Sequence, residues 1–287
     1  MVAFTAKETD ICQKPREVSM LNINSFKKMK QSGEKIVMVT AYDYPSGKFA
    51  QAANVDMVLV GDTLGMVVQG NDDTLGVSVD DIVYHCRACR RGANDTFIVA
   101  DMPYMSFHIS PEETKRNAAR LITKGKANAV KLEGGSKSRL EAISAVVDCE
   151  IPVVAHLGLT PQSIHALGGF KVQGKDVVAY NKILQQAVQT EEAGAFMLVL
   201  ESVPEKLGLE ISKAVSIPTI GIGAGRFCDG QVLVYHDILG MADLKPKFVK
   251  QYANLSKTIT NSIREYAKDV KDKNFPSDEF TYFPVKK

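Results

Sequence analysis

The sequence lacks an excess of charge of either sign and any long apolar run. Its 35 Lys and Arg residues are scattered among 33 Asp and Glu residues, for a net charge of +2, so no nucleic-acid or membrane partner is expected. No stretch of about 18 apolar residues could cross a bilayer, and residues 1–20 lack the apolar core of a secretory signal. By elimination, we expect a cytoplasmic protein that acts on small molecules.

Cysteine is also scarce. An odd, dispersed set of five fits reduced, packed thiols better than a disulfide framework. The five are Cys12, Cys86, Cys89, Cys149 and Cys228. Cys86 and Cys89 have C-x-x-C spacing, but no second pair accompanies them, and the surrounding run DDIVYHCRACRRG is typical of a helix. We therefore favour packing over zinc binding or redox chemistry for this pair.

Short apolar runs alternate with polar or glycine-containing segments and helical stretches along the chain. This alternation predicts parallel β-α units, and near-continuous hydrophobicity within the runs indicates strands covered on both sides. The eight candidate strands are Lys35–Ala41, Met57–Gly61, Phe97–Asp101, Ala129–Glu133, Pro152–His156, Phe196–Glu201, Pro218–Ile222 and Gln231–Tyr235. Candidate helices include Ser46–Ala53, Pro111–Lys124, Lys137–Val147, Tyr180–Ala193 and Pro204–Ala214.

Eight such runs predict an α/β fold of the (β/α)₈ TIM-barrel class in a single domain. With no Pro/Ser-rich linker or shift in composition, we expect a lead-in at residues 1–24, a barrel at 25–250, and a helical extension and tail at 251–287. A doubly wound open sheet is the main alternative. It would concentrate ligand residues at one switch point, whereas here they recur after many strands.

Four of the apolar runs end in an acid, namely Asp62, Asp101, Glu133 and Glu201. In a barrel these positions meet at one mouth, where uncompensated negative charge is costly. Oxygen-only ligands suit a hard divalent cation such as Mg²⁺. Any single acid of this kind could instead be a helix N-cap, but four together favour a metal site.

Two further polar residues lie at or near the ends of candidate strands, on the same side. Lys131 lies two residues before Glu133 and shares its face of the strand, where it could pair with a substrate carboxylate or form a plain salt bridge. His156 could donate a hydrogen bond to a substrate carboxylate or oxyanion, although a lone histidine is often structural.

Three glycine-rich or polar segments follow candidate strands. Gly221–Gly225 lies where barrels often bind anions, but glycines also serve tight turns. Two long segments, Val67–Thr74 and Gly158–Lys175, interrupt the alternation of strands and helices at the expected carboxyl end of the barrel. We interpret them as lids, with plain surface loops as the alternative.

Several stretches between about residue 25 and residue 250 resemble the ketopantoate hydroxymethyltransferase family. They are TAYDYPSGKFA, VLVGDTLGMVVQG, DIVYHCRACRRGA, VADMPYMSF, VKLEGG, HLGLTPQS, GGFKVQGK, LVLESVP and IPTIGIGAG with DGQVLVYHD. The resemblance implies a (β/α)₈ barrel, bound Mg²⁺, and hydroxymethyl transfer from 5,10-methylenetetrahydrofolate to 3-methyl-2-oxobutanoate, giving 2-dehydropantoate and tetrahydrofolate. It also implies a homo-oligomer, typically a decamer.

The resemblance assigns roles by motif position. Asp62 and Asp101 correspond to metal-binding acids, and Glu133 supports the metal directly or through water. Glu201 corresponds to the general base. The implied substrate contacts are Asp62, Thr63, Asp101, Lys131 and His156.

Two features depart from the family pattern. Thr63 stands where the family usually has serine, which keeps a hydroxyl but predicts a tighter pocket, and the tail segment FPSDEF differs from the common ending. Two other functions stay open: a Mg²⁺-dependent 2-oxo-acid lyase of the phosphoenolpyruvate mutase and isocitrate lyase group, and a noncatalytic ligand-binding barrel. The lyases usually carry a catalytic cysteine loop that this sequence lacks, and a noncatalytic barrel would bind ligand without turnover.

Overall fold

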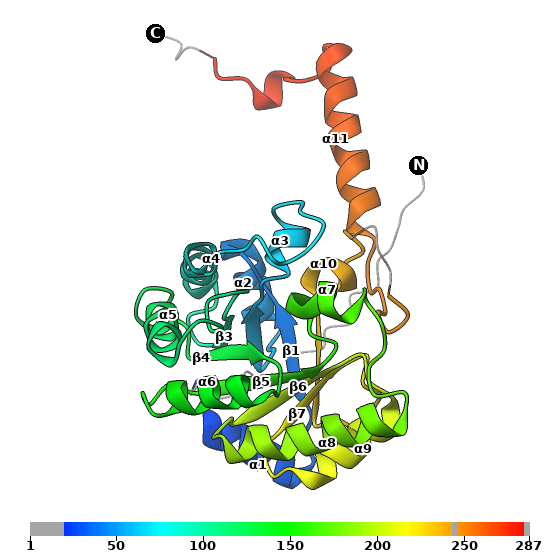
Figure 1. Cartoon of the computed structure of the whole chain (residues 1–287). Coiled ribbons are helices and arrows are strands. Elements are labelled where there is room, and N and C mark those ends of the chain that lie inside the picture. The colour runs from blue at the N-terminus through cyan, green and yellow to red at the C-terminus, as the bar shows by residue number, and fades with distance from the viewer. Residues whose placement is uncertain (1–19, 243–245, 284–287) are drawn as a thin grey trace.

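Eight parallel strands close into a barrel in the order of the sequence, with β1 pairing with both β2 and β8 (Figure 1). The computed structural model describes residues 20–242 and 246–283. The strands are β1 Ile36–Thr40, β2 Met57–Val60, β3 Phe97–Asp101, β4 Ala129–Glu133, β5 Val153–Gly158, β6 Met197–Glu201, β7 Thr219–Ile222 and β8 Gly230–Leu233. The predicted (β/α)₈ class is confirmed, whereas the proposed boundaries at residues 24 and 250 stay predictions.

Helices follow most of the strands, and each predicted helix is present within a few residues of its expected bounds. The helices are α1 Ile23–Ser32, α2 Tyr44–Ala52, α3 Leu64–Val67, α4 Val79–Gly92, α5 Pro111–Thr123, α6 Lys137–Val147, α7 Ile164–Leu167, α8 Val177–Glu192, α9 Glu205–Ala214, α10 Tyr235–Ile238 and α11 Leu255–Lys271, with short 3₁₀ turns η1 Pro161–Ser163 and η2 Asp278–Phe280. Among the described residues, none of these helices is both long and apolar enough to cross a membrane.

Side-chain caps explain where several helices begin. Asn22, Asp43 and Ser78 each accept a hydrogen bond from the backbone N–H of the third residue of the helix that follows, and that residue's side chain accepts one from the backbone N–H of the cap residue. Ser110 caps α5, where Pro111 takes the first helical position. Such caps satisfy N–H groups that have no partner within the helix.

Helices α2 and α4 approach each other at two glycines. A Cβ atom placed on Gly92 would lie 2.2 Å from the carbonyl oxygen of Tyr44, and one placed on Gly47 would lie 2.6 Å from that of Cys89. Only a residue without a side chain fits at such a contact. The glycines therefore let these two helices pack backbone to backbone.

The core has an inner and an outer part. The outer cluster lies between the strands and the surrounding helices. The inner cluster fills the barrel with side chains such as Met57, Val99 and Met197, and continues into Phe26 and Met29 of α1.

Helix α1 covers the amino-terminal end of the barrel. The ring of Phe26 meets that of Phe97, the first residue of β3, edge to face at 5.2 Å. Lys30 Nζ donates hydrogen bonds to the carbonyl oxygens of Ser212 and Ile217 and pairs with Asp229 Oδ2 at 2.9 Å. These contacts fix α1 as a floor to the barrel (Figure 1).

The outer side of β1 and β8 differs from the rest of the barrel. Each of the strands β2 to β7 has a described helix packed on it, whereas Val37 on β1 is 51% exposed. Helix α11, which follows β8 in the chain after the short α10, stands away from the barrel (Figure 1). The described part of the chain thus leaves one face of its own barrel open.

Candidate functional site

The inward-facing side of each strand is apolar deep in the barrel and polar at its carboxyl end. Val99 in β3 and Val154 in β5 belong to the inner cluster, and two residues further along the same faces come Asp101 and His156. Because strand side chains alternate with a period of two, Lys131 and Glu133 follow Ala129 on the inner face of β4, as Glu201 follows Val199 in β6.

All of the predicted site residues line one cavity of about 50 Å³ at this end of the barrel. The seven are Asp62, Thr63, Asp101, Lys131, Glu133, His156 and Glu201. Its remaining walls include the apolar side chains of Leu59, Val199 and Val232. Residues spread over about half of the chain therefore meet at one place, as their positions at strand ends predict.

Lys131 supplies the positive charge at the centre of the acids. Its Nζ lies 2.9 Å from Asp101 Oδ1 and 3.7 Å from Glu133 Oε1, and its side chain is 5% exposed. Burial acts to lower the pKa of Lys131, but Asp101, Glu133 and Asp62 outweigh burial and raise it. Lys131 is therefore a cation at any ordinary pH, and it forms the salt bridge that the sequence left as one alternative.

The acids carry more negative charge than Lys131 can offset. Burial and the neighbouring charges of Asp101 and Glu133 raise the pKa of Asp62 well above its usual range. Burial also raises the pKa of Asp101. Burial acts in the same direction on Glu133, but His156 and Lys131 outweigh it and lower the pKa of that carboxyl. A second positive charge among these side chains would relieve the repulsion.

His156 lies between Lys131 and the carboxylate of Glu201. Lys131 Nζ is 3.2 Å from His156 Nδ1, and His156 Nε2 is 3.3 Å from Glu201 Oε2. Burial and Lys131 act to lower the pKa of His156, but Glu133 and Glu201 raise it above its usual value. His156 Nδ1 also lies 3.4 Å from Glu133 Oε1. The charged ring therefore directs one N–H toward each carboxylate, and a neutral ring that accepts from Lys131 at Nδ1 carries its proton on Nε2, facing Glu201.

Backbone geometry brings these side chains together. The N–H of Asp62 donates to Asp101 Oδ2 at 3.0 Å. Gly158 has φ +95°, and a Cβ atom there would lie 2.2 Å from the carbonyl oxygen of Glu201. The N–H of Leu159 donates to that same oxygen at 2.8 Å. Glycine at position 158 thus lets the segment after β5 approach the end of β6.

Two residues of the site were not predicted from the sequence. Tyr42 is buried, and its hydroxyl is 2.7 Å from Thr63 Oγ1. Gln162 is 5% exposed, and its Nε2 donates to Asp62 Oδ2 at 2.7 Å. Tyr42 and Gln162 do lie in stretches that carry the family resemblance, TAYDYPSGKFA and HLGLTPQS, which is the one sequence signal that pointed near them.

Several buried polar atoms of the site make no hydrogen bond within the described part of the protein, which indicates that they face a bound ligand or ion. Within the described residues, Asp101 Oδ1, His156 Nε2 and Gln162 Oε1 make none, although the first two have charged neighbours. Unpaired buried polar groups are costly in proteins. Asp101 and His156 line the cavity, and Gln162 is hydrogen-bonded to Asp62 of its wall. In the described ranges, no three acidic, histidine or cysteine side chains are placed so that they could hold a metal ion by themselves. A cation here would therefore need waters or substrate oxygens as further ligands, which Mg²⁺ commonly keeps.

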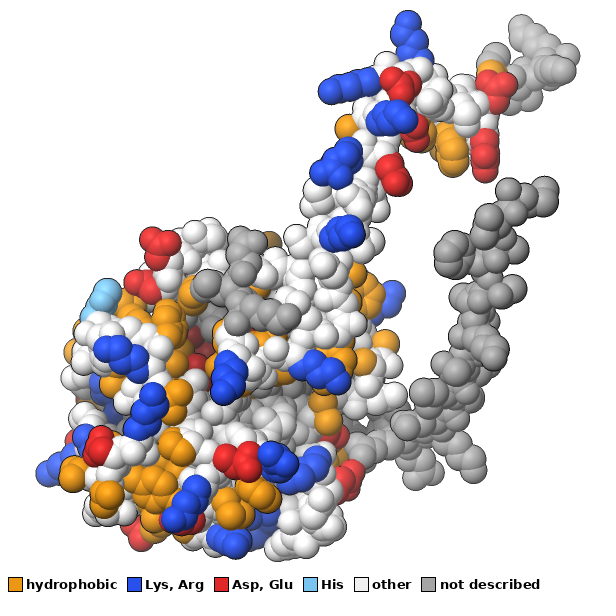
Figure 2. Space-filling model, turned by 90° about the vertical axis from the view of Figure 1, so that its right-hand side faces the viewer, with side chains coloured by type: hydrophobic (Ala, Val, Ile, Leu, Met, Phe, Trp, Pro, Cys, Tyr) orange, Lys and Arg blue, Asp and Glu red, His pale blue; other side chains and the backbone are white. Residues whose placement is uncertain are grey.

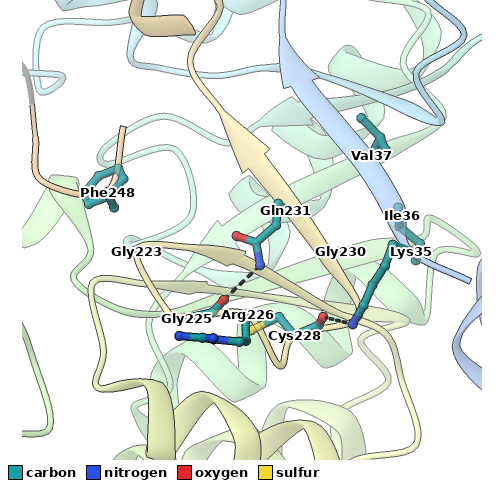
Figure 3. Close-up of a pocket in the computed structure, with 10 residues that line it drawn as sticks. All are labelled: Lys35, Ile36, Val37, Gly223, Gly225, Arg226, Cys228, Gly230, Gln231 and Phe248. Atoms are coloured by element: carbon teal, nitrogen blue, oxygen red, sulfur yellow. Dashed lines mark hydrogen bonds between the residues drawn. The ribbon is translucent and has the colours of Figure 1, made fainter. Parts of the chain in front are cut away.

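The glycine segment after β7 lies elsewhere. Gly223 and Gly225 line a groove of about 490 Å³ on the open outer side of β1 and β8, which includes none of the predicted site residues (Figure 3). They have φ values of +66° and +83° and approach Phe248 and Glu205 closely. Within the described structure, this segment therefore lies away from the predicted site residues, and its role in anion binding stays a prediction.

The described cysteines are free thiols. Cys86 and Cys89 lie buried in α4, and burial raises the pKa of Cys86 well above its usual value and that of Cys89 to about 12. Protonated, buried thiols are poor ligands and nucleophiles. Cys228 is also buried, but Cys149 is exposed and so does not pack as predicted, while Cys12 lies outside the described residues.

Several solved enzyme structures have folds similar to that of this barrel. A 2,3-dimethylmalate lyase of the PEP mutase/isocitrate lyase superfamily has a TM-score of 0.59 and 15% identity, covering 91% of this chain and 92% of that one. A phosphonopyruvate hydrolase in complex with oxalate and Mg²⁺ has a TM-score of 0.57 and 14% identity, covering 90% and 92%. These similarities concern the fold alone.

Comparisons of sequence are much closer. The 3-methyl-2-oxobutanoate hydroxymethyltransferase of Bacillus velezensis is 55% identical over 258 residues, covering 90% of this chain and 93% of the relative. That of Bacillus subtilis is 54% identical with the same coverage, and that of a Geobacillus species is 57% identical, covering 88% and 90%. Residues 20–278 match the sequence model of ketopantoate hydroxymethyltransferase, and the chain belongs to this family.

Proposed function

We propose that this chain transfers a hydroxymethyl group from 5,10-methylenetetrahydrofolate to 3-methyl-2-oxobutanoate, giving 2-dehydropantoate for pantothenate biosynthesis in the cytoplasm. Family membership supports the reaction class. The observation that carries the proposal is the single cavity in which Glu201, His156 and Lys131 face the three acids Asp62, Asp101 and Glu133. Such a site can bind a charged keto acid and remove a proton from it.

The metal proposed for this site is Mg²⁺. Asp62, Asp101 and Glu133 would hold it, since their carboxylates gather where the barrel needs a further positive charge. The chemistry supplied by bound Mg²⁺ would be stabilisation of negative charge that develops on the keto oxygen of the substrate.

The protein side chains would position the keto acid and move its proton. Lys131 would attract the substrate carboxylate, and the hydroxyl of Thr63 would fix one of the substrate's oxygens. Glu201 would take the proton from C3, with Nε2 of His156 lying 3.3 Å from its carboxylate. The C3 carbanion would then bond to the methylene carbon of the folate, whose bonds to nitrogen break while water supplies the new hydroxyl group.

Glu201→Gln tests the assigned base. Glutamine keeps the size of the side chain but cannot accept the C3 proton, so exchange of that proton in deuterated water should fall to the uncatalysed rate, as followed by proton NMR. Binding of the keto acid should persist. Glu205→Gln, which changes an exposed acid at the start of α9, is the matched control and should exchange normally. Retained exchange in Glu201→Gln would contradict the assignment.

We further propose that the chain works as a homo-oligomer, a decamer by family resemblance. The support is α11, of which no residue is buried and whose apolar side chains form one stripe. The stripe consists of Leu255, Ile259, Ile263, Tyr266 and Val270. Figure 2 shows the helix projecting beyond the body of the molecule. An unpaired apolar stripe of this kind marks an interface.

The open groove on β1 and β8 is the matching surface. Val37 and Gln231 lie on these neighbouring strands, with Phe248 at the other side of the groove (Figure 3). A (β/α)₈ barrel usually has a helix here. We assign the groove to α11 of a second copy, because each copy then both donates and receives one helix in a closed pair.

Ile263→Asp tests this interface. A carboxylate in the middle of the apolar stripe should separate the copies and reduce the mass measured by light scattering after size-exclusion chromatography. Asn261→Asp adds the same charge on the opposite face of α11, two residues before Ile263, and should leave the mass unchanged. An unchanged mass in Ile263→Asp would contradict the assignment.

A further inference from the structure

Gln162 connects the ends of three strands. It lies in η1, directly after β5, and its side chain is buried. Its Nε2 donates to Asp62 Oδ2 at 2.7 Å and to the carbonyl oxygen of Met102, next to β3, at 2.9 Å. Its backbone N–H donates to Glu133 Oε2 at 3.1 Å. One residue therefore holds the acid that follows β2 and the acid that ends β4.

The chemistry of these contacts fixes the orientation of the amide. The carbonyl oxygen of Met102 can only accept a hydrogen bond, and the ionised carboxylate of Asp62 likewise only accepts, so turning the amide over would bring Gln162 Oε1 against both acceptors. In the observed orientation, Oε1 is buried and makes no hydrogen bond with the described residues. The neighbouring Pro161 lines the cavity itself, so Gln162 stands at the wall of the site.

The segment that carries Gln162 is held at its start. The N–H of Leu159 donates to the carbonyl oxygen of Glu201, and Gly158 allows the close approach that this bond needs. The N–H of Ser163 donates to the carbonyl oxygen of Thr160 at 2.8 Å, which closes the turn around Gln162. A donor fixed in this way keeps its partners in place without a large loss of side-chain entropy at each binding event.

An amide suits this position better than a cation would. A lysine at position 162 would offset the charge of Asp62 and so compete with a bound cation. The amide of Gln162 restrains the same carboxylate and leaves its full negative charge. Carboxylates that repel each other across a cavity turn apart unless something holds them.

We propose that Gln162 is a positioning residue that holds Asp62 and Glu133 in the arrangement that binds a divalent cation. This inference rests on the proposed metal site and names a residue that acts on the metal through its ligands. Residues that orient metal ligands typically change affinity by about 10- to 100-fold when they are replaced. The side chain of Gln162 should therefore account for roughly a tenfold or greater part of the affinity for the metal.

Gln162→Met tests the proposal with Mn²⁺ as a paramagnetic probe for the Mg²⁺ site. Methionine has nearly the volume of glutamine but donates no hydrogen bond to Asp62 or Met102. We expect electron paramagnetic resonance titrations to give a Kd for Mn²⁺ that is about tenfold or more above that of the unmodified protein. Turnover by Gln162→Met should recover as the Mg²⁺ concentration is raised. Gln173→Met, on the same segment but with its amide on the exposed carbonyl of Lys171, is the matched control.

The outcomes separate this inference from the proposed function. If the unmodified protein fails to bind Mn²⁺, the metal site itself is refuted. If the unmodified protein and Gln162→Met bind with the same Kd, the metal site stands and the role of Gln162 is refuted. A lower melting temperature of the metal-free variant with unchanged Kd also refutes it, because that result marks a purely structural residue.

A second variant covers a failure of Gln162→Met to fold. Gln162→Asn keeps a buried amide but is one methylene shorter, so it cannot reach Asp62 and Met102 together. It should raise the Kd for Mn²⁺ in the same direction, and an unchanged Kd would overturn the proposal.

Discussion

Replacing Lys131 with methionine removes the one lysine among the buried acids while keeping the apolar stem. At the 2.9 Å that separates Lys131 Nζ from Asp101 Oδ1, two unit charges attract by about 6 kcal/mol at an effective dielectric constant of about 20. The cost of burying the ammonium cancels part of this. Breaking a buried pair by removing one partner generally costs about 3–5 kcal/mol, and we expect Lys131→Met to lower the free energy of unfolding of the metal-free protein by that amount.

The loss should depend on metal and on pH. Bound Mg²⁺ would restore positive charge among the acids, so the loss measured by urea denaturation should be smaller in excess Mg²⁺. Asp62 and Asp101 already have raised pKa values, and removal of Lys131 raises them further. An acid whose pKa is raised on folding contributes stability that is present at pH values below its unfolded pKa, about 4. That stability is lost as the pH rises through the folded pKa. The deficit should therefore grow as the pH rises above about 4.

Lys30→Met is the matched control, because Lys30 also forms a largely buried ion pair, with Asp229, but at the opposite end of the barrel. Its effect on the free energy of unfolding should be the same with and without Mg²⁺. The reasoning is refuted if Lys131→Met loses equal stability in both conditions, since the charge of Lys131 would then be unconnected with a cation site.

Three other perturbations test separate contacts. Gly92→Ala should lower the free energy of unfolding measured by urea denaturation by about 1–3 kcal/mol, because its Cβ would meet the carbonyl oxygen of Tyr44. Gly76→Ala, where a Cβ atom has room, is the control, and equal effects of the two changes would contradict the close helix contact. Tyr42→Phe removes the hydrogen bond to Thr63, worth about 1 kcal/mol, and should raise KM for the keto acid severalfold with little change in kcat; an unchanged KM would show that the pair does not position substrate. Mg²⁺ at about 100 times its Kd should stabilise the folded protein by about 2.7 kcal/mol, and calorimetry that shows no rise in Tm would exclude tight binding.

The sequence predicts the strands and the acids well for one physical reason. A buried parallel strand must be apolar on both faces, so its polar end is conspicuous. Strands β3 and β4 were predicted with the bounds that the structure gives them, each ending at its acid, Asp101 and Glu133. Once the barrel closes, the convergence of these acids follows from topology.

The parts that escaped prediction have no such pattern. Gln162 is a neutral residue in an irregular segment, and its partner Asp62 is 100 residues away, so neither periodicity nor charge reveals the contact. Tyr42 resembles any buried aromatic residue until its hydroxyl is seen beside Thr63. The amphipathic pattern of α11 predicts a helix with one apolar face, but it does not show whether another part of the chain covers that face. Only the structure shows that the stripe is exposed.

The floor that α1 gives the barrel has a kinetic consequence. With Phe26 and Met29 filling the amino-terminal end, molecules can reach the acids only from the carboxyl side. A site with one entrance imposes an order on two substrates when one lies deep and the other covers it. The keto acid would have to bind before the folate, and the product formed from the keto acid would have to leave after the folate product. Product inhibition patterns should therefore show an ordered rather than a random addition of substrates.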